Sequence, residues 1–125
     1  MNLVDSSAWL EYFAGGAQAG QFAAVIEDVA ALLVPTIVLL EVTRRVMQQR
    51  GDDEALQVAA VLHQGQVVAL DGALALSAAQ LGVAHKLPLA DSIIYATAKQ
   101  YDATVWTMDA DFAALLGVRY FPKRK

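Results

Sequence analysis

The chain has 125 residues, the length of one ordinary domain with a single hydrophobic core. Hydrophobic residues make up 57% and charged residues 18%, which excludes intrinsic disorder and leaves apolar surface for a partner. The formal net charge of −4 argues against a protein that coats nucleic acid through bulk positive charge. The absence of cysteine excludes disulfides and thiolate metal sites. With no basic leader and no apolar run long enough for a membrane span, we expect a cytoplasmic protein.

Short apolar runs alternate with helical segments along the chain. The pattern predicts strands at residues 2–4, 31–34, 66–70, 103–107 and 118–121. It predicts a first helix that is capped near Asp5 and ends at Phe13, and further helices at about residues 21–29, 36–49, 52–63, 72–84, 88–101 and 111–116. This alternation is typical of an α/β fold, so we expect a single domain over residues 1–125 with a mainly parallel central sheet flanked by helices.

Four acidic residues stand where an apolar stretch ends or where a helix turns its buried face. Asp5 ends the first predicted strand, and Asp109 lies just past the fourth. Asp91 falls in the first turn of a predicted helix, while Glu41 lies one turn into another and borders its apolar face. Ligands of parallel sheets gather beyond the carboxyl ends of the strands, so we expect the four side chains to surround one crevice.

Each acid also has a plain structural explanation. Asp5 can cap a helix, and Asp91 can be stabilised by a helix dipole. Glu41 can pair with the arginine three or four residues further along its helix. Asp109 and Asp111 can be turn and cap residues, since aspartate is common after a strand. Singly these explanations compete well, but four acids at topologically related positions favour a shared functional site.

A divalent cation is the partner that best offsets four carboxylates among apolar neighbours. Oxygen ligands, without cysteine and with only two scattered histidines, indicate Mg²⁺ or Mn²⁺ rather than zinc. Two such ions would bring the formal charge of −4 to about zero. The acidity of the chain is therefore compatible with a polyanionic substrate when metal is bound.

Three stretches together resemble a known family. They are NLVDSSAWL near the start, Glu41 on the long second-quarter helix, and LPLADSIIYATAKQYDATVWTMDADF near the end. In this order and spacing they are similar to the PIN domain and, more narrowly, to the VapC-type toxins of toxin–antitoxin pairs. The resemblance covers nearly the whole chain, and its last stretch is the most specific part.

The resemblance implies a metal-dependent endoribonuclease that hydrolyses single-stranded RNA and leaves 5′-phosphate and 3′-hydroxyl ends. The catalytic and metal-binding quartet of the family falls on the four acids named above: Asp5, Glu41, Asp91 and Asp109. Asp111 resembles an auxiliary acid, and Ser6 and Thr107 are placed to orient bound water. Ala110 stands where many relatives have a basic residue, which leaves one substrate contact in doubt.

An RNA substrate also needs cations for its phosphates, and two kinds of protein partner are expected. The cationic candidates are Arg44, Arg45, Lys86, Arg119 and the tail at residues 123–125. The surplus apolar surface suits a homodimer or a groove that holds a segment of an antitoxin, and the resemblance implies both.

Other classes of protein fit less well. A phosphoacceptor signalling domain would have adjacent acids after its first strand and a late lysine, but serines follow Asp5 and no lysine ends the strand at residues 103–107. The acidic pair at residues 52–53 follows a helix and Gly51 instead of an apolar strand. A haloacid-type phosphatase would have a second aspartate where Ser7 stands. A non-catalytic binding module of the same fold remains, although four intact acids argue against it.

Overall fold

A five-stranded parallel sheet forms the centre of the molecule in a computed structural model that describes residues 1–123. Its strands, in the spatial order β3-β2-β1-β4-β5, are β1 (Asn2–Val4), β2 (Leu32–Pro35), β3 (Gln66–Val68), β4 (Thr104–Thr107) and β5 (Val118–Tyr120). Every neighbouring pair is parallel, so all five carboxyl ends lie along one edge. The expected α/β fold with a mainly parallel sheet is confirmed.

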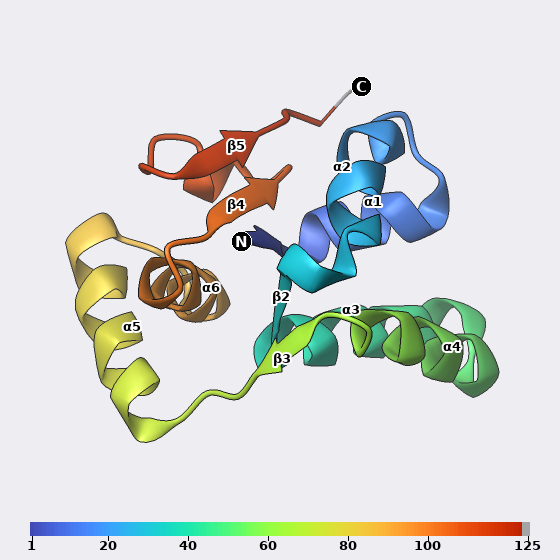
Figure 1. Cartoon of the computed structure of the whole chain (residues 1–125), viewed down its shortest axis with the longest axis horizontal. Helices are drawn as coiled ribbons and strands as arrows, with labels where there is room; N and C mark the ends of the chain where they lie inside the picture. The colour runs from blue at the N-terminus through green and yellow to red at the C-terminus, as the bar shows by residue number, and fades with distance from the viewer. Residues whose placement is uncertain (124–125) are drawn as a thin grey trace.

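Helices cover both faces of this sheet (Figure 1). They are α1 (Ser6–Ala14), α2 (Ala19–Glu27), α3 (Thr36–Arg50), α4 (Asp52–Leu62), α5 (Gly72–His85) and α6 (Leu89–Gln100), with short 3₁₀ turns η1 (Val29–Ala31) and η2 (Ala110–Phe112). The α5–α6 pair lies on one side, and α1 and α2 lie on the other (Figure 1). Helices α3 and α4 form a hairpin near the β2–β3 edge (Figure 1). Within residues 1–123, no helix combines the length and apolarity needed to cross a membrane.

The strand order places a topological switch beside β1. The chain moves from β1 outward to β2 and β3, and then returns to the other side of β1 with β4 and β5. Connections on the two sides therefore diverge, and a crevice opens above the carboxyl ends of β1 and β4. The residues that directly follow these two strands are thus placed together by topology alone.

The core explains why the central strands read as nearly unbroken apolar runs. Leu3, Val4, Leu33 and Val105 have no exposed side-chain surface, because both faces of a parallel sheet are covered by helices. On the α5–α6 side, Gly82 allows the two helices to approach closely, since a Cβ there would collide with the hydroxyl of Ser92. This close approach fixes α6, whose first turn carries Asp91.

Three elements differ from the sequence-based expectation by two residues or more, and the bounds of the others agree to within one residue. The strand predicted to reach residue 70 ends at Val68, because the chain leaves the sheet and Asp71 caps α5 through Leu74 N. The helix predicted at residues 111–116 is only the 3₁₀ turn η2, which the Asp109 side chain initiates. The helix predicted at residues 21–29 ends at Glu27 and is followed by η1.

Candidate active site

Asp5 sits at the junction of β1 and α1, with only 2% of its surface exposed. Its Oδ1 accepts a hydrogen bond from Ala8 N at 3.1 Å, which makes it the N-cap of α1. The capping role expected of a lone aspartate is therefore real. It does not account for the depth of burial, because an ordinary cap lies at the surface.

Two hydroxyl groups hold the Asp5 carboxylate in place. Ser7 Oγ donates to Asp5 Oδ1 at 2.7 Å, and Thr107 Oγ1 donates to Asp5 Oδ2 at 2.7 Å. The same hydroxyls accept hydrogen bonds from the loop after β4, Ser7 from Met108 N at 3.1 Å and Thr107 from Asp109 N at 2.9 Å. This network fixes the end of β1 relative to the loop that carries Asp109.

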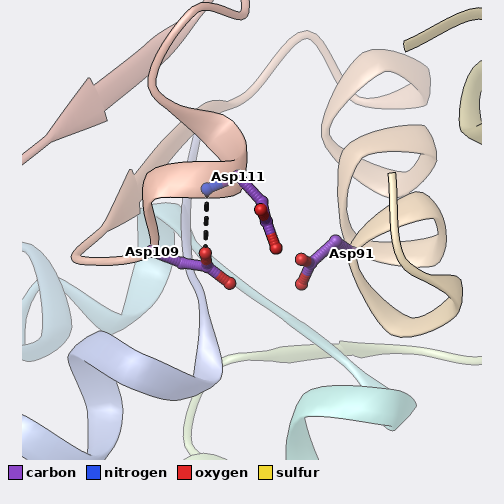
Figure 2. Close-up of side chains that lie close together, drawn as sticks. All are labelled: Asp91, Asp109 and Asp111. Carbon is purple, nitrogen blue, oxygen red and sulfur yellow. Dashed lines mark hydrogen bonds between the residues drawn. The ribbon is translucent and has the colours of Figure 1, made fainter. Parts of the chain in front are cut away.

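Three further carboxylates converge next to this network. Oxygens of Asp91, Asp109 and Asp111 lie within 4.8 Å of one another. Asp91 projects from α6 toward the two aspartates of the segment after β4, as Figure 2 shows. Asp109 Oδ1 accepts a hydrogen bond from Asp111 N at 2.9 Å, and this bond turns the η2 segment so that Asp111 points toward Asp91. We call these three residues the aspartate cluster.

The electrostatics of the site are strained without a cation. Burial raises the pKa of Asp5 to about 6, although hydrogen bonds from Thr107, Ser7 and Ala8 oppose the shift and the charge of Asp109 adds to it. Burial and, after it, the negative charges of Asp109, Asp5 and Asp111 together raise the pKa of Asp91 to about 7. The charge of Asp109 therefore raises the pKa of both Asp5 and Asp91, so these carboxyl groups are electrostatically coupled.

Glu41 approaches the site from α3. Its Oε1 accepts a hydrogen bond from Ser6 Oγ at 2.7 Å, which links α3 to the start of α1. Among the described residues the only ion pair is Arg50–Glu54, so the expected pairing of Glu41 with Arg44 or Arg45 is absent. Glu41 and Asp5 both lie outside the set of oxygens within 4.8 Å that defines the aspartate cluster.

The donor set fits a hard divalent cation. The aspartate cluster offers only carboxylate oxygens, the ligands that Mg²⁺ and Mn²⁺ prefer. The raised pKa of Asp91 reports like-charge repulsion on top of burial, and a bound cation would remove that repulsion. An acidic site that is able to hold a metal is therefore present. Asp109 and Asp111 follow Asp91 in the chain by 18 and 20 positions.

Three of the cations predicted to contact substrate lie in different places. Arg45 lines a groove with Ser6 and Glu41, which we call the α1–α3 groove. Arg44 faces another side of α3, where it lines a hollow with Leu40 and Met47. Lys86 is the exposed C-cap of α5, in the turn that leads into α6.

The roles of three residues were not fully apparent from the sequence. Ser7 was overlooked, although a second hydroxyl in the first turn after a capping aspartate was an available signal. Thr107, predicted to orient water, also donates to Asp5 and accepts from the backbone of Asp109, a positioning role that the sequence did not indicate. Asp111 was ranked below the quartet, yet the structure places it in the aspartate cluster.

Replacing Thr107 with valine should weaken the positioning of Asp5 and Asp109 without changing the volume of the side chain at position 107. Asp5 Oδ2 and Asp109 N would both lose a buried partner, so we expect about 1–3 kcal/mol less stability. Groups that support a metal ligand typically contribute about 10- to 100-fold in affinity, and calorimetric titration with Mn²⁺ should show a loss of that size. Thr97→Val is the matched control, because Thr97 is equally buried but its hydroxyl bonds only to Ile93 O within α6. Equal Mn²⁺ affinity in both variants would contradict the positioning role.

A parallel α/β domain with acids gathered at its topological switch defines a class of site suited to phosphate chemistry with metals. The sequence matches the family model of the PIN domain over residues 3–116. The chain therefore belongs to the PIN domain family. A comparison with curated protein sequences gave no match.

Solved structures with the same fold include a toxin–antitoxin complex and a toxin. A toxin–antitoxin complex from Klebsiella pneumoniae aligns with a TM-score of 0.84 and 22% identity, over 98% of this chain and 100% of that one. VapC20 of Mycobacterium tuberculosis, described as a sarcin–ricin loop cleaving toxin, aligns with a TM-score of 0.79 and 22% identity over 98% and 100%. FitAcB from Neisseria gonorrhoeae aligns with a TM-score of 0.72 and 22% identity, over 98% of each chain.

Proposed function

We propose that this protein is a metal-dependent endoribonuclease and the toxin of a toxin–antitoxin pair. The observation that carries the proposal is the convergence of Asp91, Asp109 and Asp111 beside the buried Asp5, at the carboxyl ends of β1 and β4. Membership of the PIN domain family and the likeness to VapC20, a toxin that cleaves RNA, support the same function. The reaction is hydrolysis of an RNA phosphodiester that leaves 5′-phosphate and 3′-hydroxyl ends, in the cytoplasm.

Some of the acidic side chains would bind the cation, and hydroxyl groups hold the others in place. Asp91 and Asp109 would provide oxygens to the cation, with Asp111 as a further donor in the same cluster. Asp5 and Glu41 complete the negative site from β1 and α3, each held by a hydroxyl of the first turn of α1. A bound Mg²⁺ or Mn²⁺ would lower the pKa of a water molecule and neutralise charge that develops on the phosphate.

The protein surface supports the two protein partners that we propose, a second copy of the chain and an antitoxin. Several large apolar side chains are exposed on α3, α4, α5 and the start of α6, namely Leu40, Met47, Leu56, Leu76, Val83 and Leu89. A second groove of about 440 Å³, which adjoins the α1–α3 groove at Leu10, Ala14 and Gln49, is lined by Phe13, Val46, Val58 and Val61 and by the Arg50–Glu54 pair, which suits an amphipathic peptide segment. Light scattering that finds only monomers would remove the homodimer.

The direct test is cleavage of a panel of structured and unstructured RNAs with Mg²⁺, with Mn²⁺, and with a chelator. We expect cleavage only with metal, recovery when metal is restored in excess of chelator, and one dominant cut site whose ends carry 5′-phosphate. Cleavage that persists in chelator and is equal in an Asp91→Asn variant would indicate a contaminating nuclease. Complete absence of cleavage across the panel, with Mn²⁺ binding intact, would leave a binding module of the same fold.

A further inference from the structure

The α1–α3 groove is a second feature of the acidic side of the molecule. It has a volume of about 710 Å³ and begins at Ser6 and Glu41, next to the proposed catalytic residues. From there it follows α1 and α3 past Arg45 and Gln49, and Lys123 of the C-terminal segment also lines it. The groove beside α4 also contains a cation of α3, Arg50, but that side chain is paired with Glu54.

The cations of the groove form no ion pair within residues 1–123. The one ion pair there joins Arg50 to Glu54, and neither Arg45 nor Lys123 takes part in it. Glu11 is the other acid of the groove besides Glu41, but its carboxylate accepts a hydrogen bond from Gln18 N at 2.8 Å and is turned toward the α1–α2 connection. Two positive charges therefore remain available in a protein whose formal net charge is −4.

Lys123 is carried to the groove by a fixed segment of chain. Phe121 N donates to Thr107 O at 2.8 Å, which extends the β4–β5 pairing by one residue. Pro122 O accepts a hydrogen bond from Gln18 Nε2 at 2.9 Å, which ties the same segment to the start of α2. The other two residues of the predicted basic tail, Arg124 and Lys125, lie outside the described residues.

We propose that the α1–α3 groove binds the RNA strand that flanks the scissile phosphate, with Arg45 and Lys123 contacting successive backbone phosphates. This inference rests on the proposed nuclease function and adds the path of the substrate to it. A strand in the groove passes directly from Arg45 to the carboxylates, since Ser6 and Glu41 belong to both sites. The cations of the α1–α3 groove form no ion pair within residues 1–123 and favour a polyanion here, whereas the cation of the groove lined by Phe13 and Val58 is already paired with Glu54.

Binding of a short fluorescein-labelled single-stranded RNA, measured by anisotropy in chelator at several salt concentrations, tests the path. Each phosphate contact on a single strand contributes about 0.7 to the slope of log affinity against log salt. Arg45→Gln and Lys123→Gln should each lower the slope by about 0.7, and each should weaken binding about fourfold at about 0.15 M salt. The double variant should lose about 15-fold. Lys99→Gln removes the same charge from exposed α6, where Lys99 lies over Tyr95, and should change neither quantity.

The outcomes separate this proposal from the nuclease assignment. Loss of affinity in the groove variants supports the path even if the wild-type protein cleaves no RNA, because binding is measured without metal. Unchanged affinity and slope in the double variant would overturn the path while leaving metal-dependent cleavage intact. An equal loss in Lys99→Gln would reduce the effect to overall charge and overturn it too. If RNA binding is unchanged but a coexpressed antitoxin no longer copurifies with the double variant, the groove belongs to the antitoxin.

Discussion

Replacing Asp91 with asparagine is expected to abolish metal-dependent RNA cleavage while leaving the fold intact. Asp91 carries the most raised pKa of the site, and two other carboxylates of the aspartate cluster face it. Asparagine keeps the shape but removes the charge that a cation needs. The loss should exceed the roughly 10- to 100-fold that follows removal of a group supporting a metal ligand, because this residue is itself a proposed ligand. Initial cleavage rates under saturating Mn²⁺ measure it.

The matched control is Asp53→Asn, which makes the same chemical change at an exposed residue in the first turn of α4. It should cleave RNA at the wild-type rate. Mn²⁺ titration of both variants separates loss of metal from loss of chemistry, and only Asp91→Asn should show weakened binding. Wild-type cleavage and wild-type Mn²⁺ affinity in a folded Asp91→Asn protein would remove Asp91 from the proposed site.

The positions of the acids along the fold could be predicted because they depend on topology. A short apolar run that ends at Asp5, and another that ends shortly before Asp109, indicate two parallel strands whose carboxyl ends share one edge. Alternation of strands and helices makes the strands parallel, so these acids lie at the same edge of the sheet. Residues that directly follow strands inherit their place from the backbone, and local sequence is sufficient to find them.

The side-chain contacts within the site could not be predicted in the same way. Whether Asp111 faces Asp91 depends on the single hydrogen bond from Asp111 N to Asp109, and a run of Asp-Ala-Asp is equally compatible with a longer helix. Thr107 and Ser7 donate to opposite oxygens of Asp5, a pairing across 102 positions of sequence for Thr107 that no local pattern specifies. Long-range hydrogen bonds are properties of the packed structure.

Helical periodicity predicts different positions for Arg44 and Arg45, which the sequence-based prediction grouped together. Residues four apart lie on one face of a helix, so Arg45 shares the face of Glu41 while Arg44 is rotated away from it. The structure shows this separation, with Arg45 in the α1–α3 groove and Arg44 beside Leu40 and Met47. The sequence-based prediction did not distinguish the two arginines, although they lie on different faces of α3.

The metal-free protein is expected to lose stability as the pH rises from about 4 to about 8. Folded Asp5 and Asp91 have pKa values of about 6 and about 7, against 3.8 as the ordinary value for the unfolded chain. Between about pH 4 and about pH 7 the folded state binds more protons than the unfolded state, so the free energy of unfolding falls with rising pH. Its extra stability is fully present below about pH 4 and is lost once the pH has passed about 7. The Asp5 shift corresponds to about 3 kcal/mol, and half-buried Asp91 adds less than its shift implies because solvent screens it.

Guanidinium unfolding in chelator across this pH range measures the effect, and two comparisons assign it. Asp91→Asn should flatten the upper part of the profile, between about pH 6 and 8, because it removes the group that titrates near 7. Mn²⁺ at about 100 times its dissociation constant should restore about 2.7 kcal/mol at pH 8, since the cation binds only the folded site. Metal should have little effect at pH 5, where protonated carboxyls cannot serve as ligands. A free energy of unfolding that stays constant or rises over this range without metal, in a protein that binds Mn²⁺, would show that these carboxylates are not held together under repulsion.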